Sequence, residues 1–134
     1  MGSRTTGIRC VCFDCEHVAT TVLIVDDHPS FRATARALLE SEGFDVVGEA
    51  ENGVRALAAA RDLCPDLVLL DVHLPDFDGF EVASRLKTNG CPPAVVITSS
   101  HDVGDYGSLV RESGALGFVP KAELSGDALA ALLN

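Results

Sequence analysis

Short, continuous apolar runs alternate along this chain with longer amphipathic segments. The runs are five or six residues long and rich in β-branched residues, which is typical of strands that are buried on both faces of a parallel sheet. They cover residues 21–25, 45–49, 66–71, 94–98 and 115–119. The pattern therefore predicts five strands.

The segments between these runs have the periodicity of amphipathic helices. In the first, Phe31, Ala35 and Leu39 share one helical face, and Gly43 provides a stop. The predicted helices cover residues 30–42, 53–63, 77–87, 104–113 and the segment that follows Ser125 as a cap. Glycines weaken the fourth of them, which we expect to form a mobile signalling face.

Alternating strands and helices with short connections predict an α/β fold. Because right-handed crossovers place helices on both faces of buried strands, we expect a doubly wound, five-stranded parallel sheet. A length of 134 residues suits one domain, which we expect over residues 21–134. Residues 1–20 lack the pattern and are predicted to be a disordered leader.

This leader contains three of the five cysteines, Cys10, Cys12 and Cys15, beside His17. Structural zinc sites usually combine separated pairs of ligands, so the crowded run favours an unstructured leader over a zinc site. No apolar run approaches the roughly 20 residues that span a bilayer, and no signal-peptide pattern is present. We therefore expect a cytoplasmic protein, without membrane association, whose five cysteines are reduced.

The chain carries a formal net charge of −10. Residues 1–20 contain two arginines and two acids, so all ten excess negative charges lie in residues 21–134. Such a domain repels the phosphates of nucleic acids, and we expect no direct nucleic-acid binding by this chain. Its acids are better suited to a cation or to a basic partner.

Polar residues stand where the predicted strands end. Asp26 and Asp27 follow the first strand, Asp71 and Thr98 end the third and fourth, and Lys121 follows the fifth. Because the carboxyl ends of parallel strands meet at one edge of a sheet, these side chains should converge. Clustered carboxylates call for a cation such as Mg²⁺, which commonly pairs with phosphoryl groups, and an ammonium suits a phosphate oxygen. The arrangement predicts a phosphoryl site in which a carboxylate can be the nucleophile.

Four separated segments carry a family resemblance. They read VLIVDDHPSFR, DLVLLDVHLPDFDGFEV, AVVITSS and GALGFVPKAEL. Through them, residues 21–133 resemble the receiver domain of two-component response regulators. The DDHP and GFVPK stretches are most similar to the subgroup that is usually joined to a LuxR-type helix-turn-helix. The resemblance implies a flavodoxin-like strand order 2-1-3-4-5.

The resemblance also implies the chemistry of the acids. Asp71 would accept a phosphoryl group from a phosphohistidine on a sensor histidine kinase. The protein ligands of Mg²⁺ would be Asp26, Asp27, Asp71 and the backbone carbonyl of His73. The ion would neutralise charge on the phosphoryl oxygens during transfer.

Three further positions complete the implied switch. The Thr98 hydroxyl would move toward the phosphoryl group, Lys121 would pair with another phosphoryl oxygen, and the Phe118 ring would change its rotamer. These changes would alter a protein-interaction face around the fourth and fifth helices, which could also form a homodimer. The family usually has a cis-proline after the lysine, but this chain has Ala122. A cis Lys121–Ala122 bond would cost about 2.5–4 kcal/mol, so we expect a trans bond or a remodelled loop.

The function implied is a phosphoacceptor receiver in transcription regulation. It would not be an enzyme beyond its own phosphotransfer and dephosphorylation. One alternative is a pseudo-receiver that binds proteins independently of phosphorylation. Another is an aspartyl-phosphate phosphatase of the haloacid-dehalogenase type, which usually has an Asp where this chain has His73. Asp76, Asp78 and Gly79 are expected to shape the loop and start the next helix.

Overall fold

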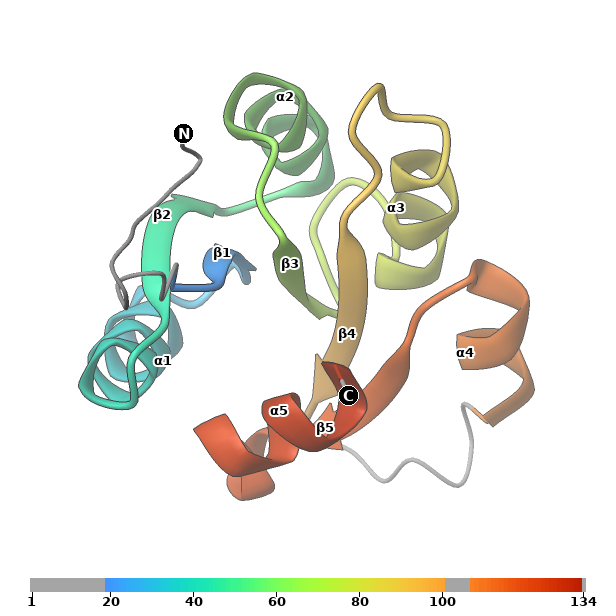
Figure 1. The fold of residues 1–134 in the computed structure, drawn as a ribbon. Coiled ribbons are helices and arrows are strands. Elements are labelled where there is room, and N and C mark those ends of the chain that lie inside the picture. The colour runs from blue at the N-terminus through green and yellow to red at the C-terminus, as the bar shows by residue number, and fades with distance from the viewer. Residues whose placement is uncertain (1–18, 101–106, 134) are drawn as a thin grey trace.

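The computed structural model describes residues 19–100 and 107–133, and its sheet has the expected strand order (Figure 1). The strands are β1 (Thr21–Val25), β2 (Asp45–Ala50), β3 (Leu67–Asp71), β4 (Ala94–Ser99) and β5 (Gly117–Pro120). They pair in parallel in the order β2-β1-β3-β4-β5. This is the doubly wound, flavodoxin-like order that the sequence predicts.

Helices cover both faces of the sheet (Figure 1). They are α1 (Pro29–Ser41), α2 (Gly53–Leu63), α3 (Gly79–Leu86), α4 (Gly107–Ser113) and α5 (Gly126–Leu133), with a 3-10 turn η2 (Lys121–Glu123) after β5. Helices α2 and α3 pack on one face, whereas α1 and α5 pack on the other. No helix in residues 19–100 or 107–133 is long and apolar enough to cross a membrane.

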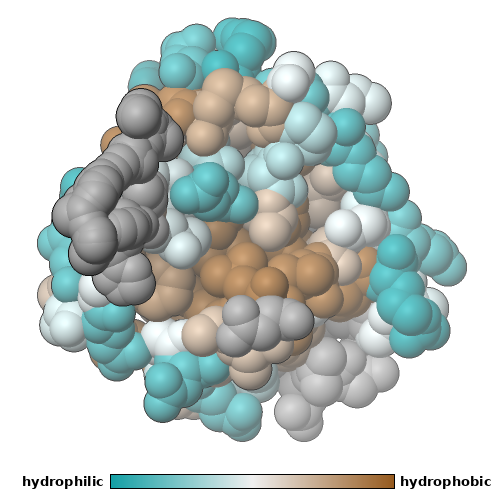
Figure 2. Space-filling view, in the orientation of Figure 1, coloured by the Kyte–Doolittle hydropathy of each residue, from teal (hydrophilic) through white to brown (hydrophobic). Residues whose placement is uncertain are grey.

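Alternate residues of each central strand serve the two apolar cores. On β1, Leu23 and Val25 pack with the α2–α3 face, and Val22 and Ile24 pack with the α1–α5 face. Both sides of the strand are therefore buried, which explains why its sequence is continuously apolar rather than alternating. Apolar residues also gather on the surface near the centre of one face (Figure 2).

Side-chain caps fix where helices α2 and α3 begin. The Asn52 side chain accepts a hydrogen bond from the N–H of Arg55 at 2.8 Å, and Asp78 accepts one from the N–H of Glu81 at 2.8 Å. Because Asp78 is the N-cap, α3 begins at Gly79 rather than at residue 77 as predicted. The predicted role of Asp78 at the helix start is confirmed.

Asp76 makes a link that the sequence does not reveal. Its carboxylate accepts hydrogen bonds from the N–H groups of Gly53 at 2.7 Å and Val54 at 3.0 Å, at the start of α2 rather than α3. Burial alone would raise the pKa of Asp76, but these bonds and one from the N–H of Phe77 lower it overall. Asp76 thus ties the loop after β3 to helix α2.

The predicted boundaries of the C-terminal elements shift by a few residues. Strand β5 spans residues 117–120, since its ladder with β4 begins where Gly117 pairs with Val96. Helix α4 begins at residue 107 within the described part, and residues 104–106 of the predicted helix lie outside it. Ser125 accepts a hydrogen bond from the N–H of Ala128 at 3.0 Å, which confirms it as the cap of α5.

Two cysteines form a disulfide, so the prediction of five reduced cysteines was wrong for this pair. Cys64, at the end of α2, is bonded to Cys91, in the connection between α3 and β4, with a Cα–Cα distance of 5.6 Å. Helix packing brings together residues 27 positions apart, a proximity that the sequence does not show. Cys10, Cys12, Cys15 and His17, with the predicted leader, lie outside the described residues apart from Ala19 and Thr20.

We predict that the Cys64–Cys91 disulfide stabilises the fold by about 3 kcal/mol, because it restricts the unfolded chain over this separation. Urea unfolding of the wild type with and without reductant measures the effect. Cys91→Ser should match the reduced wild type and be insensitive to reductant. A wild type whose unfolding midpoint does not change on reduction would contradict the prediction.

Candidate functional site

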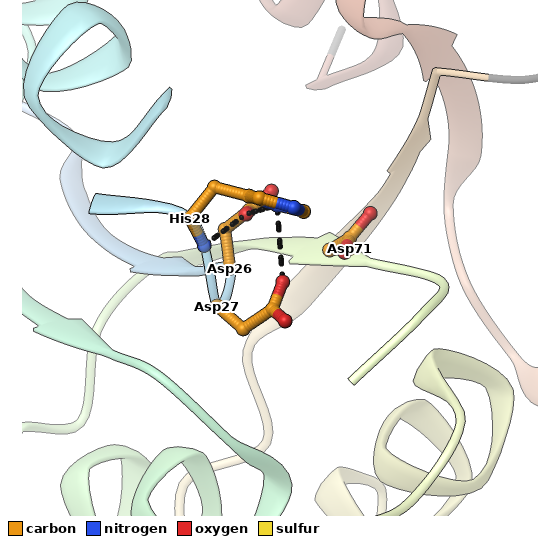
Figure 3. A group of neighbouring side chains, drawn as sticks. All are labelled: Asp26, Asp27, His28 and Asp71. Carbon is orange, nitrogen blue, oxygen red and sulfur yellow. Dashed lines mark hydrogen bonds and ion pairs between the residues drawn. The ribbon is translucent and has the colours of Figure 1, made fainter. Parts of the chain in front are cut away.

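Three carboxylates meet at the carboxyl edge of the sheet. Asp26 and Asp27 lie on the segment that leaves β1, and Asp71 ends the neighbouring strand β3 (Figure 3). Asp26 and Asp71 are buried, at 0% and 3% exposed, whereas the Asp27 side chain is 38% exposed. One oxygen from each acid and one nitrogen of His28 lie within 4.8 Å of one another. The predicted convergence of these acids is therefore present.

His28 joins this group through contacts that the sequence analysis missed. Its Nδ1 lies 2.9 Å from Asp26 Oδ1 and 3.0 Å from Asp27 Oδ1, and its backbone N–H donates to Asp26 Oδ1 at 2.8 Å. The imidazole therefore holds two adjacent carboxylates in one orientation (Figure 3). Its position directly after the Asp pair is the signal in the sequence that could have identified it.

Lys121, which follows the edge strand β5, places a positive charge beside these carboxylates. Its Nζ lies 2.5 Å from Asp26 Oδ2 and 3.5 Å from Asp71 Oδ1, and the side chain is only 16% exposed. The residue belongs to η2, and the chain has no cis peptide bond among the described residues, so the Lys121–Ala122 bond is trans. The ammonium nevertheless reaches both buried carboxylates without a proline after it.

The negative charge of Asp71 is only partly compensated by its surroundings. Burial raises its pKa most, the charge of Asp26 raises it further, and Lys121 offsets these effects only in part. The result is a carboxyl whose pKa lies above its ordinary value. A cation bound between the acids would oppose the effects of burial and of the Asp26 charge. The three acids are therefore suited to bind a cation.

Thr98 lies beside Asp71 in the register of β3 and β4. Thr98 is 1% exposed, and its hydroxyl oxygen has no hydrogen-bond partner among the residues that the structure describes. Its backbone carbonyl, by contrast, accepts a hydrogen bond from the N–H of Val72 at 3.0 Å. A buried hydroxyl without a partner is costly, by about 1–3 kcal/mol, so Thr98 is suited to a group that arrives at Asp71.

The remaining predicted residues lie around this centre. His73 follows Asp71 by two positions, in the loop before α3, and makes an isolated antiparallel bridge with Asp78. Phe118 is half-buried on β5, where it pairs with Ile97 and packs against the α2–α3 core. Its packing matches the expected core role, and its switching role stays a prediction, as does the carbonyl role of His73.

Gly79 allows the loop after β3 to close tightly behind Asp71. Its N–H donates to the carbonyl of Val72 at 2.7 Å. A Cβ at this position would collide with the carbonyl oxygen of Asp71. Gly79 therefore shapes this loop, as predicted, because only a residue without a Cβ allows the backbone to approach so closely.

Comparisons with known proteins agree on one family. The family model described as "Response regulator receiver domain" matches residues 22–133. The Bordetella pertussis protein named "Virulence factors putative positive transcription regulator BvgA" is 44% identical over 102 residues, covering 76% of this chain and 49% of that protein. The chain thus spans about half the length of the curated relatives it matches.

Solved structures give the same result. The receiver domain of the response regulator NarL from Mycobacterium tuberculosis has a TM-score of 0.77 at 33% identity, covering 88% of this chain and 99% of that one. A LuxR-family two-component response regulator from Aurantimonas sp. SI85-9A1 also has a TM-score of 0.77, at 30% identity, covering 87% of this chain and 86% of that one. The predicted similarity to the LuxR subgroup is confirmed.

We predict that Asp71→Asn stabilises the domain at neutral pH. Because its pKa is raised, folded Asp71 binds a proton more readily than unfolded Asp71, so its contribution to stability falls as pH rises through these pKa values. Removing the charge should raise the free energy of unfolding by about 0.5–2 kcal/mol at pH 7.5, the range typical of single stabilising substitutions.

Urea unfolding in EDTA measures this difference. It should shrink toward pH 4, where the wild-type carboxyl becomes protonated. Asp62→Asn, on a side chain that is 74% exposed, is the control and should change the free energy of unfolding by less than about 0.5 kcal/mol. A less stable Asp71→Asn variant at pH 7.5 would contradict the prediction.

Proposed function

The chain belongs to the family of response regulator receiver domains, and we propose that Asp71 is the residue that accepts the phosphoryl group. One observation carries this proposal. A buried carboxylate with a raised pKa ends β3 beside an unpartnered Thr98 hydroxyl and within 3.5 Å of the Lys121 ammonium. The Asp71 carboxylate and the Thr98 hydroxyl are costly in the resting fold, and all three groups would have a use once a phosphoryl group is attached.

In the proposed reaction, an Asp71 carboxylate oxygen attacks the phosphorus of a phosphohistidine on a sensor histidine kinase. A P–O bond forms, the P–N bond breaks, and the imidazole leaves with its electron pair and takes up a proton. The product is an acyl phosphate on Asp71. The Thr98 hydroxyl then donates to one phosphoryl oxygen and the Lys121 ammonium to another, which stabilises the charge of the transferred group.

The acid cluster is suited to Mg²⁺. Carboxylate oxygens are the hard ligands that this ion prefers, and the three acids together carry more negative charge than Lys121 balances. The proposed ligands are Asp26, Asp27, Asp71 and the backbone carbonyl of His73. When bound, Mg²⁺ would neutralise charge on the phosphoryl oxygens.

The wider context of the chain is also a proposal. The chain spans about half the length of relatives that are named as transcription regulators, and we infer that its phosphorylation controls transcription. The acidic domain itself would not contact DNA, and it would catalyse only its own phosphotransfer and dephosphorylation. It would work in the cytoplasm, alone or as a homodimer. The intact acid cluster favours this reading over a pseudo-receiver, and the family match leaves the phosphatase reading without support.

We predict one phosphoryl adduct, on Asp71, after treatment with acetyl phosphate and Mg²⁺. Intact-protein mass spectrometry followed by peptide mapping measures it. EDTA should prevent the adduct because the acids would then lack their cation, and Asp71→Asn should remain unlabelled while it stays folded. An unlabelled wild type, or a variant that is labelled as strongly as the wild type, would overturn the proposal.

We predict that Thr98→Val separates stability from phosphorylation. Replacing a buried hydroxyl that has no partner should leave the free energy of unfolding unchanged or raise it by about 1 kcal/mol. The same change should slow phosphorylation by acetyl phosphate about tenfold, because a hydrogen bond to the charged phosphoryl group is lost.

The conservative variant Thr98→Ser retains the hydroxyl and should phosphorylate at close to the wild-type rate. Stopped-flow labelling and urea unfolding supply the two readouts. If Thr98→Val instead destabilises the protein by more than 1 kcal/mol and leaves labelling unchanged, the hydroxyl has a structural role only.

A further inference from the structure

The ammonium of Lys121 lies over the ring of Phe31, with Nζ 4.4 Å from the ring centroid. Phe31 belongs to the first turn of α1, whereas Lys121 belongs to η2, after β5. The contact therefore joins two segments that are 90 positions apart at the carboxyl edge of the sheet. This ring is an uncharged neighbour of an ammonium that also contacts the carboxylates of Asp26 and Asp71.

The Phe31 ring is held in place by its surroundings. Phe31 is half-buried and packs against the α1–α5 core, so its back is held by apolar side chains. Pro29 begins α1 and restricts the backbone of its first turn. The next residue, Arg32, donates to the backbone carbonyl of Asp26 at 2.6 Å, which fastens this turn to the acid-bearing segment. The Phe31 ring thus offers a fixed aromatic face to the flexible side chain of Lys121.

The ring differs from the carboxylates in what phosphorylation would do to it. Asp71 would become an acyl phosphate, and Asp26 would share its charge with a cation. Both ion pairs of Lys121 would therefore change during the reaction, whereas the face of the Phe31 ring would keep its negative potential. The aromatic contact would keep the ammonium near Asp71 while its ionic partners change.

We propose that Phe31 is a positioning residue that holds the Lys121 ammonium at the phosphoryl site through a cation–π contact. This inference rests on the proposed function. Lysine has a flexible four-carbon stem, and in this chain no proline follows it to restrict the loop. Without the ring, the ammonium would occupy more orientations and would meet the phosphoryl oxygens less often. A contact of this kind corresponds to roughly two- to thirtyfold in a rate or an equilibrium.

The test compares Phe31→Leu with Phe31→Tyr, and uses Phe44→Leu as a matched control. Phe44 packs against the same core but lies after the other end of α1. The rate constant of Asp71 phosphorylation by acetyl phosphate and Mg²⁺ should fall about tenfold in Phe31→Leu. It should stay within about twofold of wild type in the other two variants, since tyrosine keeps the ring face. Equal rates in Phe31→Leu and wild type would overturn the inference.

A double-mutant cycle shows whether Phe31 acts through Lys121. In a Lys121→Ala background, Phe31→Leu should have no further effect on the rate. A full tenfold loss in that background would assign the effect to helix packing and overturn the inference. Replacing the Phe31 ring by its fluorinated analogue, which keeps the shape but weakens the negative face, covers the case in which Phe31→Leu fails to fold. The analogue should also slow phosphorylation.

Nuclear magnetic resonance supplies a readout that needs neither phosphodonor nor Mg²⁺. The ε-methylene protons of Lys121 should be shielded by the ring in wild type and should lose this shift in Phe31→Leu but not in Phe44→Leu. An unshifted wild-type signal would overturn the inference alone. A shifted signal in a wild-type protein that is never labelled at Asp71 would overturn the proposed function, and the positioning role with it.

Discussion

The repulsion between two buried carboxylates, Asp26 and Asp71, is the constraint around which the site is arranged. The parallel sheet creates it, because β1 and β3 are neighbours and each delivers an acid to the same edge. Lys121 compensates part of the charge, at 2.5 Å from Asp26 and 3.5 Å from Asp71, and the pKa of Asp71 still lies above its ordinary value. A cation and a phosphoryl group are chemical partners that such an edge can accept without rearranging the fold.

The apolar core supports this costly arrangement. Leu70 and Ile97, the residues before Asp71 and Thr98, are fully buried and paired across β3 and β4, so the two polar side chains are carried into place by strands that cannot easily move. Functional sites often retain groups that would be replaced if stability alone mattered. The unpartnered Thr98 hydroxyl and the poorly compensated Asp71 are both of this kind.

The sequence predicted the sheet well because strand position and face depend on local pattern. The bounds of β1 agree with the prediction, and the convergence of the acids follows from the topology of parallel sheets. Contacts between distant segments were not predictable. The Cys64–Cys91 bond and the Phe31–Lys121 contact each depend on how helices and loops pack. The hydrophobic periodicity of the sequence does not contain this information. The family resemblance gave the lysine a phosphoryl oxygen as its partner, but it did not indicate the contact with the Phe31 ring.

The two sides of the site are held in different ways, and this difference suits their roles. On the side of Asp71, the proposed nucleophile, Asp76 fastens the loop after β3 to the start of α2, and the disulfide fastens the end of α2 to the connection before β4. On the other side, the Lys121 ammonium is held by the Asp26 carboxylate and the Phe31 ring, and its residue belongs to a three-residue turn. An attacking carboxylate benefits from a fixed position, because small displacements of reacting atoms are costly in rate. In the proposed function, the Lys121 ammonium follows a newly attached phosphoryl group and needs limited freedom instead. A contact with a ring face leaves its N–H groups free to change acceptors.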